Sequence, residues 1–294
     1  MLLCVDVGNT QTALALYAEQ ESDAVWTARI RTERRATGDE LALTLRGMLG
    51  ARSAEVDGVA ALSTVPALLR ELRSMLDGHF ASVEHVLVVP GVRTGVPLLV
   101  DNPKEIGADR VVQALAAHER HGGACVVVDF GTSTTIDAVS ARGEFLGGAI
   151  AAGVAVSAEA LAARAAALRP VELVAPASAL GRNTVESMQA GLVLGAAAQV
   201  DGLVRRLGAE IVTRDPTAGP IAVVASGGLA PLVVPECVTV TDHVPDLALR
   251  GLRSVFARTR DASRNRADRR AGRDGPSRRG RVAGRKDGLT DAQP

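Results

Sequence analysis

The sequence Asp6-Val7-Gly8-Asn9-Thr10 has a counterpart 123 residues later, Asp129-Phe130-Gly131-Thr132-Ser133. Each stretch follows a short apolar run, residues 2–5 or 126–128, and precedes a second run of strand character. Each is therefore expected to form a strand, a tight turn and a strand, with a carboxylate at the tip of the first strand. The duplication indicates a molecule built from two similar halves that bring both carboxylates together.

The two turns suit a phosphate group held with a cation. Gly8 and Gly131 permit positive φ and leave no Cβ between the backbone and a ligand. Asp6 and Asp129 would repel phosphate unless a cation stands between them. Two ordinary β-turns are the alternative, because Asp-x-Gly is common at turns, but the shared flanks of both copies favour a ligand site. The hydroxyls able to donate to phosphate are those of Thr10, Thr12, Thr132, Ser133 and Thr134.

The composition predicts an α/β protein. The chain has 294 residues, of which 47% are hydrophobic and only 2% aromatic, so its core must consist of Ala, Val and Leu. Alternating strands and helices predict βαβ units and a largely parallel sheet. Beyond the two turns, we expect strands at 25–31, 59–65, 85–89, 145–150 and 221–225, and helices at 40–49, from Pro66, at 157–168 and at 183–207.

The sequence also indicates in which cellular compartment the protein is expected. No run of 18 or more apolar residues occurs, so no spanning helix is expected. The chain begins directly with a strand-like run, without the features of a secretory signal, which predicts a cytoplasmic protein with no membrane partner. Cys4 and Cys125 lie in the two aspartate-bearing strands, and Cys237 lies in a proline-flanked segment near a third strand. Their spacing argues for structural cysteines rather than a zinc site or disulfide framework.

Charge is divided between the body and the C-terminal tail. Residues 258–294 contain 12 Lys and Arg against 5 Asp and Glu, a net of +7, whereas the preceding residues contain 21 against 28, a net of −7. The tail has almost no large apolar residues, which predicts disorder. Its arginines could contact nucleic acid, contact the acidic body, or simply be solvated. The tail has no aromatic residue to stack on bases, so a nucleic-acid partner is not expected.

A substrate segment is expected between the predicted strand at 85–89 and the helix that begins near Val111. Asp109 falls in the first turn of that helix, after Gly107. An acidic residue is favoured there by the helix dipole alone, by about 0.3–1 kcal/mol. From the residues themselves, that reading and a functional Asp109 both stay open.

Taken together, these stretches resemble the type III pantothenate kinases, which belong to the acetate kinase, sugar kinase, Hsp70 and actin superfamily. The resemblance covers the chain to about residue 257 and implies two ribonuclease-H-like (actin-like ATPase) domains, residues 1–118 and 119–257, with a cleft between them. The tail 258–294 is no part of it. The blocks that carry it are 6–10, 90–95, 102–103, 107–110, 129–132, 147–148, 157–161, 181–184 and 226–229.

The resemblance implies a homodimeric kinase that uses ATP and Mg²⁺ to convert pantothenate to 4'-phosphopantothenate, the first step of coenzyme A biosynthesis. It further implies that Asp109 is the general base and that Asp129 holds a monovalent cation, K⁺ or NH₄⁺. The residues expected to bind ATP are Asp6, Val7, Gly8, Asn9, Thr10, Gln11, Thr12, Ala13 and Thr132, and those expected to bind pantothenate are Gly107, Ala108, Asp109, Arg110 and Thr184.

The chain departs from the family pattern at two positions. Val100 stands where members usually have an aromatic residue, and Ala152 where they usually have proline. The first change removes a flat wall from the expected substrate pocket. Two other functions therefore stay open: a kinase of another small hydroxy acid or sugar, and a non-catalytic nucleotide-binding homologue that regulates through partners.

Overall fold

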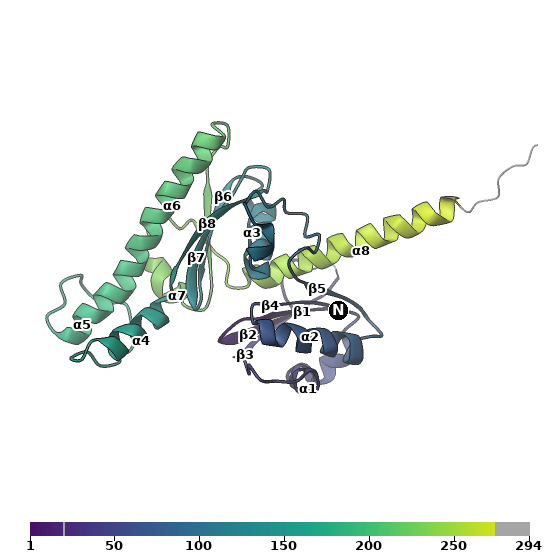
Figure 1. The fold of residues 1–294 in the computed structure, drawn as a ribbon, viewed down its shortest axis with the longest axis horizontal. Coiled ribbons are helices and arrows are strands. Elements are labelled where there is room, and N and C mark those ends of the chain that lie inside the picture. Colours follow the sequence, from purple (N-terminus) through teal and green to yellow (C-terminus); the bar gives the residue numbers. More distant parts are fainter. Residues whose placement is uncertain (20, 274–294) are drawn as a thin grey trace, which may run out of the picture. The chain divides into compact units, whose positions relative to one another are not determined.

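Two five-stranded sheets with the same strand order make up the core of the protein (Figure 1). The computed structural model describes residues 1–19 and 21–273. Met1–Thr259 form one compact unit, and the residues from Arg260 onward are grouped separately.

The first sheet combines a hairpin meander with two parallel strands. Its order is β3-β2-β1-β4-β5, with β1 antiparallel to β2, β2 antiparallel to β3, and β4 and β5 parallel to β1. The short turn after β1 forces an antiparallel return, whereas a helical crossover between β4 and β5 permits parallel pairing. The strands are β1 Leu2–Val7, β2 Gln11–Tyr17, β3 Trp26–Arg31, β4 Gly58–Ser63 and β5 Glu84–Val88.

The second sheet repeats this plan. Its order is β10-β9-β6-β7-β8, so β6 to β10 correspond one by one to β1 to β5. The expected α/β fold of two ribonuclease-H-like halves is confirmed. The expectation of a largely parallel sheet is wrong, because both aspartate-bearing strands lead into tight hairpins. The strands are β6 Cys125–Phe130, β7 Ser133–Val139, β8 Phe145–Ala152, β9 Ala222–Ser226 and β10 Asp242–His243.

The helices cover the sheet faces and provide the crossovers. Pro66 opens α2 at its first turn, as predicted. The helix expected at 183–207 runs from α5 through a π-helical stretch, Ala190–Leu194, into α6. The bounds are α1 Gly38–Leu49, α2 Pro66–His79, α3 Ala108–His121, α4 Val154–Arg164, α5 Thr184–Gln189, α6 Gly195–Arg214, α7 Ala230–Val233 and α8 Leu247–Arg273.

Helix α3 lies between the two sheets and contributes to a core on each side. Val112 and Leu115 pack with Cys4 in the core of the first sheet. Ala114 and Ala117 pack with Cys125 and its neighbours in the core of the second sheet. The small alanine side chains allow close approach of helix and sheet, so the start of α3 is positioned by both halves of the molecule.

Two predictions about boundaries have no direct test. The expected division between residues 118 and 119 falls inside α3, and Met1–Thr259 form one unit, so the two-domain division stays a prediction. Residues 258–273 of the expected disordered tail belong to α8, and residues 274–294 lie outside the described residues. In the described part of the chain, no helix has the length and apolar character needed to span a membrane.

Candidate active site

Each of the two sequence-related turns is closed by a backbone hydrogen bond, the first turn is one residue longer than the second, and the two meet at their tips. The N–H of Gly8 donates to the carbonyl of Gln11 at 3.0 Å, and the N–H of Gly131 donates to that of Ser133 at 3.0 Å. A Cβ at Gly8 would lie 2.9 Å from the Gln11 carbonyl oxygen, so glycine keeps the first turn tight. Thr10 Oγ1 and Thr132 Oγ1 lie 3.0 Å apart, joining one loop to the other.

A cleft of about 610 Å³ opens beside these turns, between the residues of the two sheets. This volume falls in the range of small-molecule sites. Turns that contain glycine line one side of the cleft, among them the turn with Gly227 and Gly228 after β9. The predicted site residues that line the cleft are Asp6, Gly8, Asn9, Thr10, Gln11, Ala13, Asp109, Asp129 and Thr132.

Three carboxylates, from β1, α3 and β6, converge in this cleft. The pKa of Asp6 is raised to about 7, first by burial and then by the charges of Asp109 and Asp129. Burial likewise raises the pKa of Asp129 to about 6, with contributions from Asp109 and Asp137. Burial also raises the pKa of Asp109. Crowded acids of this kind resist ionisation together, which makes the cleft a site that favours a cation.

Helix α3 presents two functional side chains one turn apart. Gln113 lies four residues after Asp109, so both occupy the same face of the helix. The buried Gln113 Nε2 donates to Asp129 Oδ2 at 3.2 Å and thereby ties α3 to the tip of β6. The sequence argument missed Gln113, although its i+4 spacing from Asp109 was a usable signal.

Two arginines, one on β3 and one in the loop that follows it, also line the cleft and were missed from the sequence. Arg29 lies on β3, opposite Ala13, and its Nη2 donates to the Pro245 carbonyl at 2.7 Å. Arg34 Nε donates to the Asn9 carbonyl at 3.2 Å. Both bring positive charge beside the glycine turns, where an anionic ligand would meet it. Neither follows a recognisable motif, so only the fold places them here.

Comparison with known proteins agrees with this geometry. A family model described as type III pantothenate kinase matches residues 2–206. The chain belongs to the type III pantothenate kinase family. A protein of that name from Saccharopolyspora erythraea is 59% identical over 265 residues, 88% of this chain and 98% of the relative. Another from Rhodococcus jostii is 56% identical over 260 residues, 88% of this chain and 95% of the relative.

A solved structure supports the fold at lower sequence similarity. A conserved Campylobacter jejuni protein, described as a Baf family transcriptional activator, superposes with a TM-score of 0.54 at 14% identity. The match covers 88% of this chain and 99% of that chain. At this identity the likeness shows a shared fold.

The cleft fits the nucleotide and divalent metal that a kinase of this family uses. Gly228 faces the cleft and has no atom nearer than 3.7 Å to the position of a Cβ, which leaves the backbone open to a ligand. Among the described residues, no three His, Cys, Asp or Glu side chains form a ready metal cage. A Mg²⁺ ion in this cleft would therefore take most of its oxygens from phosphate and water, as is usual for that ion.

Several expected site residues do not line this cleft. Val7 and Thr12 are buried in their strands, and Thr12 Oγ1 lies 3.0 Å from Thr32 Oγ1. Thr184 is exposed at the start of α5. Gly107 precedes α3 as its N-cap, and the side chain of Arg110 pairs with Asp137 of the second sheet. Direct roles for these residues in substrate binding stay predictions.

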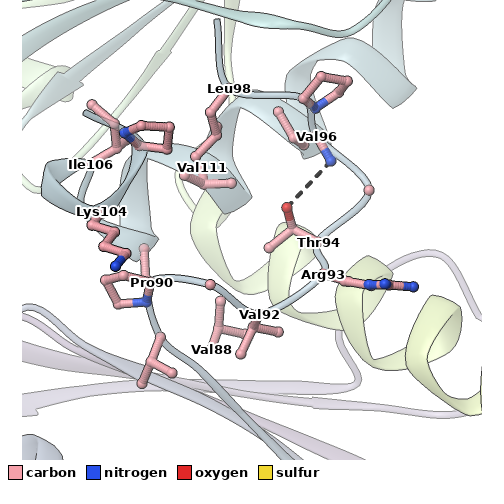
Figure 2. Close-up of a pocket in the computed structure, with 16 residues that line it drawn as sticks. Val88, Pro90, Val92, Arg93, Thr94, Val96, Leu98, Lys104, Ile106 and Val111 are labelled. Atoms are coloured by element: carbon pink, nitrogen blue, oxygen red, sulfur yellow. Dashed lines mark hydrogen bonds between the residues drawn. The ribbon is translucent and has the colours of Figure 1, made fainter. Parts of the chain in front are cut away.

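Ala108 lines a second, apolar pocket at the start of α3. This pocket has a volume of about 610 Å³ and lies between the segment 88–98 and the start of α3. In Figure 2, Val92, Val96, Leu98, Ile106 and Val111 surround it, and the Thr94 hydroxyl bonds the N–H of Val96 at 3.3 Å. The lining of this pocket contains no carboxylate.

Proposed function

We propose that this chain transfers the γ-phosphoryl group of ATP to the primary hydroxyl of pantothenate, which yields 4'-phosphopantothenate in the first step of coenzyme A biosynthesis. The observation that carries the proposal is the convergence of Asp6, Asp109 and Asp129 on one cleft between two glycine turns. Membership of the type III pantothenate kinase family supplies the substrate class.

Asp109 is proposed as the general base. It lies in the first turn of α3, where backbone hydrogen bonds from Arg110 and from Asp109 itself oppose the effect of burial, which raises its pKa. Phosphoryl transfer has a loose transition state, so a carboxylate at this place first orients the acceptor hydroxyl and takes its proton late. The other expected ligands of pantothenate are Gly107, Ala108, Arg110 and Thr184.

The turns 6–13 and 131–133 are proposed to hold the phosphates, with Asp6 and Asp129 facing the cations. Bound Mg²⁺ and a monovalent cation, K⁺ or NH₄⁺, offset the negative charge of the phosphate oxygens. Gly8, Thr10 and Thr132 fix the loop tips so that their N–H and hydroxyl groups are already oriented. Asp129 is held in place by Gln113, which supports its assignment to the monovalent cation.

We further propose a cytoplasmic homodimer. Thr184 is expected to contact pantothenate, yet it does not line the cleft of its own chain, so a second copy would supply it. Large apolar side chains are exposed near it and on β8: Leu180 at 84%, Val185 at 49% and Ile150 at 65%. Sedimentation equilibrium of the purified chain tests the dimer, and a monomer at all concentrations would contradict it.

A coupled assay of ADP release tests the main proposal. The chain is incubated with ATP and Mg²⁺, with and without K⁺, and with pantothenate or a panel of other small hydroxy acids and sugars. ADP release that requires pantothenate and K⁺ supports the proposal. Release with another acceptor alone would favour the second candidate, and nucleotide binding without turnover on any acceptor would favour a non-catalytic homologue.

A further inference from the structure

A buried ion pair anchors the start of α3 to the second sheet. Arg110 follows Asp109 in the first turn of α3, and Asp137 lies in the middle of β7. Arg110 Nε donates to both carboxylate oxygens of Asp137, at 3.2 and 3.0 Å, and Arg110 Nη2 donates to Asp137 Oδ1. Asp137 is only 2% exposed, so this pair is shielded from solvent.

The guanidinium of Arg110 is fixed in orientation as well as position. Its central carbon lies 5.4 Å from the ring centre of Phe145, so one face rests on an aromatic ring. A Cβ at Gly148 would come within 2.5 Å of Asp137 Oδ1, so β8 leaves the carboxylate no room for a longer side chain. Asp137 uses the Nε and Nη2 side of the guanidinium. Among the described residues, Nη1 makes no hydrogen bond, so the opposite edge is the one that would meet a carboxylate ligand.

The same pair restrains Asp109. Arg110 and Asp109 are adjacent in one helical turn, and burial of Asp109, which raises its pKa, is partly offset by backbone hydrogen bonding from Arg110. A Cβ at Gly107 would collide with the Asp109 carboxylate, so that carboxylate is folded back over the helix start. The contact with Asp137 therefore restrains the residue next to Asp109 in the same helical turn.

We propose that Asp137 is a positioning residue for phosphoryl transfer: it holds Arg110 with one edge free for an anionic acceptor, and through Arg110 it holds Asp109 beside the cleft. This inference rests on the proposed function and extends it to a residue of the second sheet. An ion pair that served folding alone would be a weak stabiliser, since two buried charges gain little over apolar packing. The pair instead lies directly beside Asp109, the proposed general base.

A second ion pair on the same helix, more exposed than the first, provides a control. At the C-terminal end of α3, Arg120 Nε donates to Asp242 Oδ2 at 2.5 Å, which links α3 to β10 of the second sheet. Asp242→Asn therefore loosens the same helix against the same sheet, but far along the helix from Asp109. Asp137→Asn removes one charge without changing the size of the side chain.

The experiment compares steady-state kinetics of the full chain and its Asp137→Asn, Asp242→Asn, Arg110→Gln and Asp137→Asn/Arg110→Gln variants. For Asp137→Asn we expect kcat/KM for pantothenate to fall about 100-fold, with a raised KM, because small misplacements at a reacting centre cost this much. The KM for ATP should stay within about twofold, and Asp242→Asn should leave all constants within about twofold. In the Arg110→Gln background, Asp137→Asn should have less than about a threefold effect, because the two residues act as one unit.

Each contrary outcome bears on a defined claim. Wild-type kcat/KM in Asp137→Asn, an equal loss in Asp242→Asn, or an undiminished loss in the Arg110→Gln background would overturn the positioning role. Failure of Asp137→Asn to fold, judged by thermal unfolding and binding of a non-hydrolysable ATP analogue, would show a structural role and overturn it too. Absence of turnover on pantothenate by the wild-type chain would instead overturn the proposed function and this inference with it.

Discussion

Replacing Asp6 by asparagine should stabilise the metal-free protein above neutral pH while it abolishes activity. The pKa of Asp6 is raised from 3.8 to about 7, by burial first and then by Asp109 and Asp129. Among the described residues, Asp6 accepts no side-chain hydrogen bond that would favour its ionised form. Ionising it in the folded state is therefore costly, and asparagine removes that cost.

The magnitude follows from the pKa difference. Each pKa unit corresponds to about 1.4 kcal/mol, so ionisation of Asp6 lowers the free energy of unfolding by at most about 4 kcal/mol. Relaxation of the cleft and water entry reduce this, and we expect a gain of about 1–3 kcal/mol. Because the folded-state pKa is raised, wild-type stability is fully present below about pH 4 and falls as the pH rises through about 7. The gain of Asp6→Asn should therefore be near zero in acid and largest in weak alkali.

Urea unfolding in the presence of a chelator, at a series of pH values from about 4 to 8.5, measures the effect. Asp101→Asn, which neutralises an exposed carboxylate outside the cleft, is the control and should change little at any pH. Addition of ATP and Mg²⁺ should stabilise the wild type more than Asp6→Asn, since the variant lacks a carboxylate for the cation. The reasoning fails if Asp6→Asn is no more stable than wild type at the alkaline end, or if its gain does not depend on pH.

Three further predictions concern the cleft. Asp109→Asn should keep the fold and the KM for ATP, while its kcat in the ADP-release assay should fall about 10²–10⁴-fold, the usual range for removal of a general base. Near-normal turnover would show that Asp109 is not the general base. Gln113→Leu should raise the K⁺ concentration needed for half-maximal activity by about tenfold, because Asp129 loses the donor that orients it; an unchanged K⁺ titration would separate Asp129 from the cation. Gly8→Ala places a Cβ 2.9 Å from the Gln11 carbonyl oxygen, so we expect the KM for ATP to rise about tenfold while the KM for pantothenate stays constant. Equal changes in both KM values would instead indicate a general disruption of the fold.

The sequence could predict the parts of the site that follow from local rules. An apolar run, an aspartate and a glycine with hydroxyl neighbours specify a strand and a tight turn, and both copies were found at the expected places. The meeting of the two turns was expected from the duplication itself, and the resemblance to a kinase family added the cleft between the two halves. Asp109 was placed correctly in the first turn of a helix, although the residues alone left its role open.

What the sequence missed depends on contacts between distant segments. Arg29 reaches the cleft because β3 pairs with β2 next to the first turn, and Asp137 meets Arg110 because α3 packs on β7. Neither pairing has a local signature. The expectation of a largely parallel sheet was wrong for a related reason. Alternating strands and helices indicate parallel pairing, but a tight turn makes the two strands it joins antiparallel, whichever element comes next in the chain.

Helix α3 explains why so many functional features depend on one short segment. Its apolar residues Val112 and Ala114 belong to the cores of different sheets, so its position reflects both halves of the molecule. Its polar residues Asp109, Arg110 and Gln113 bond or face groups of the cleft and of the second sheet. A displacement of one sheet relative to the other must therefore move this helix start against either Asp6 or Asp129. Substitutions that loosen α3 at its N-terminal turn should therefore impair catalysis before they impair folding.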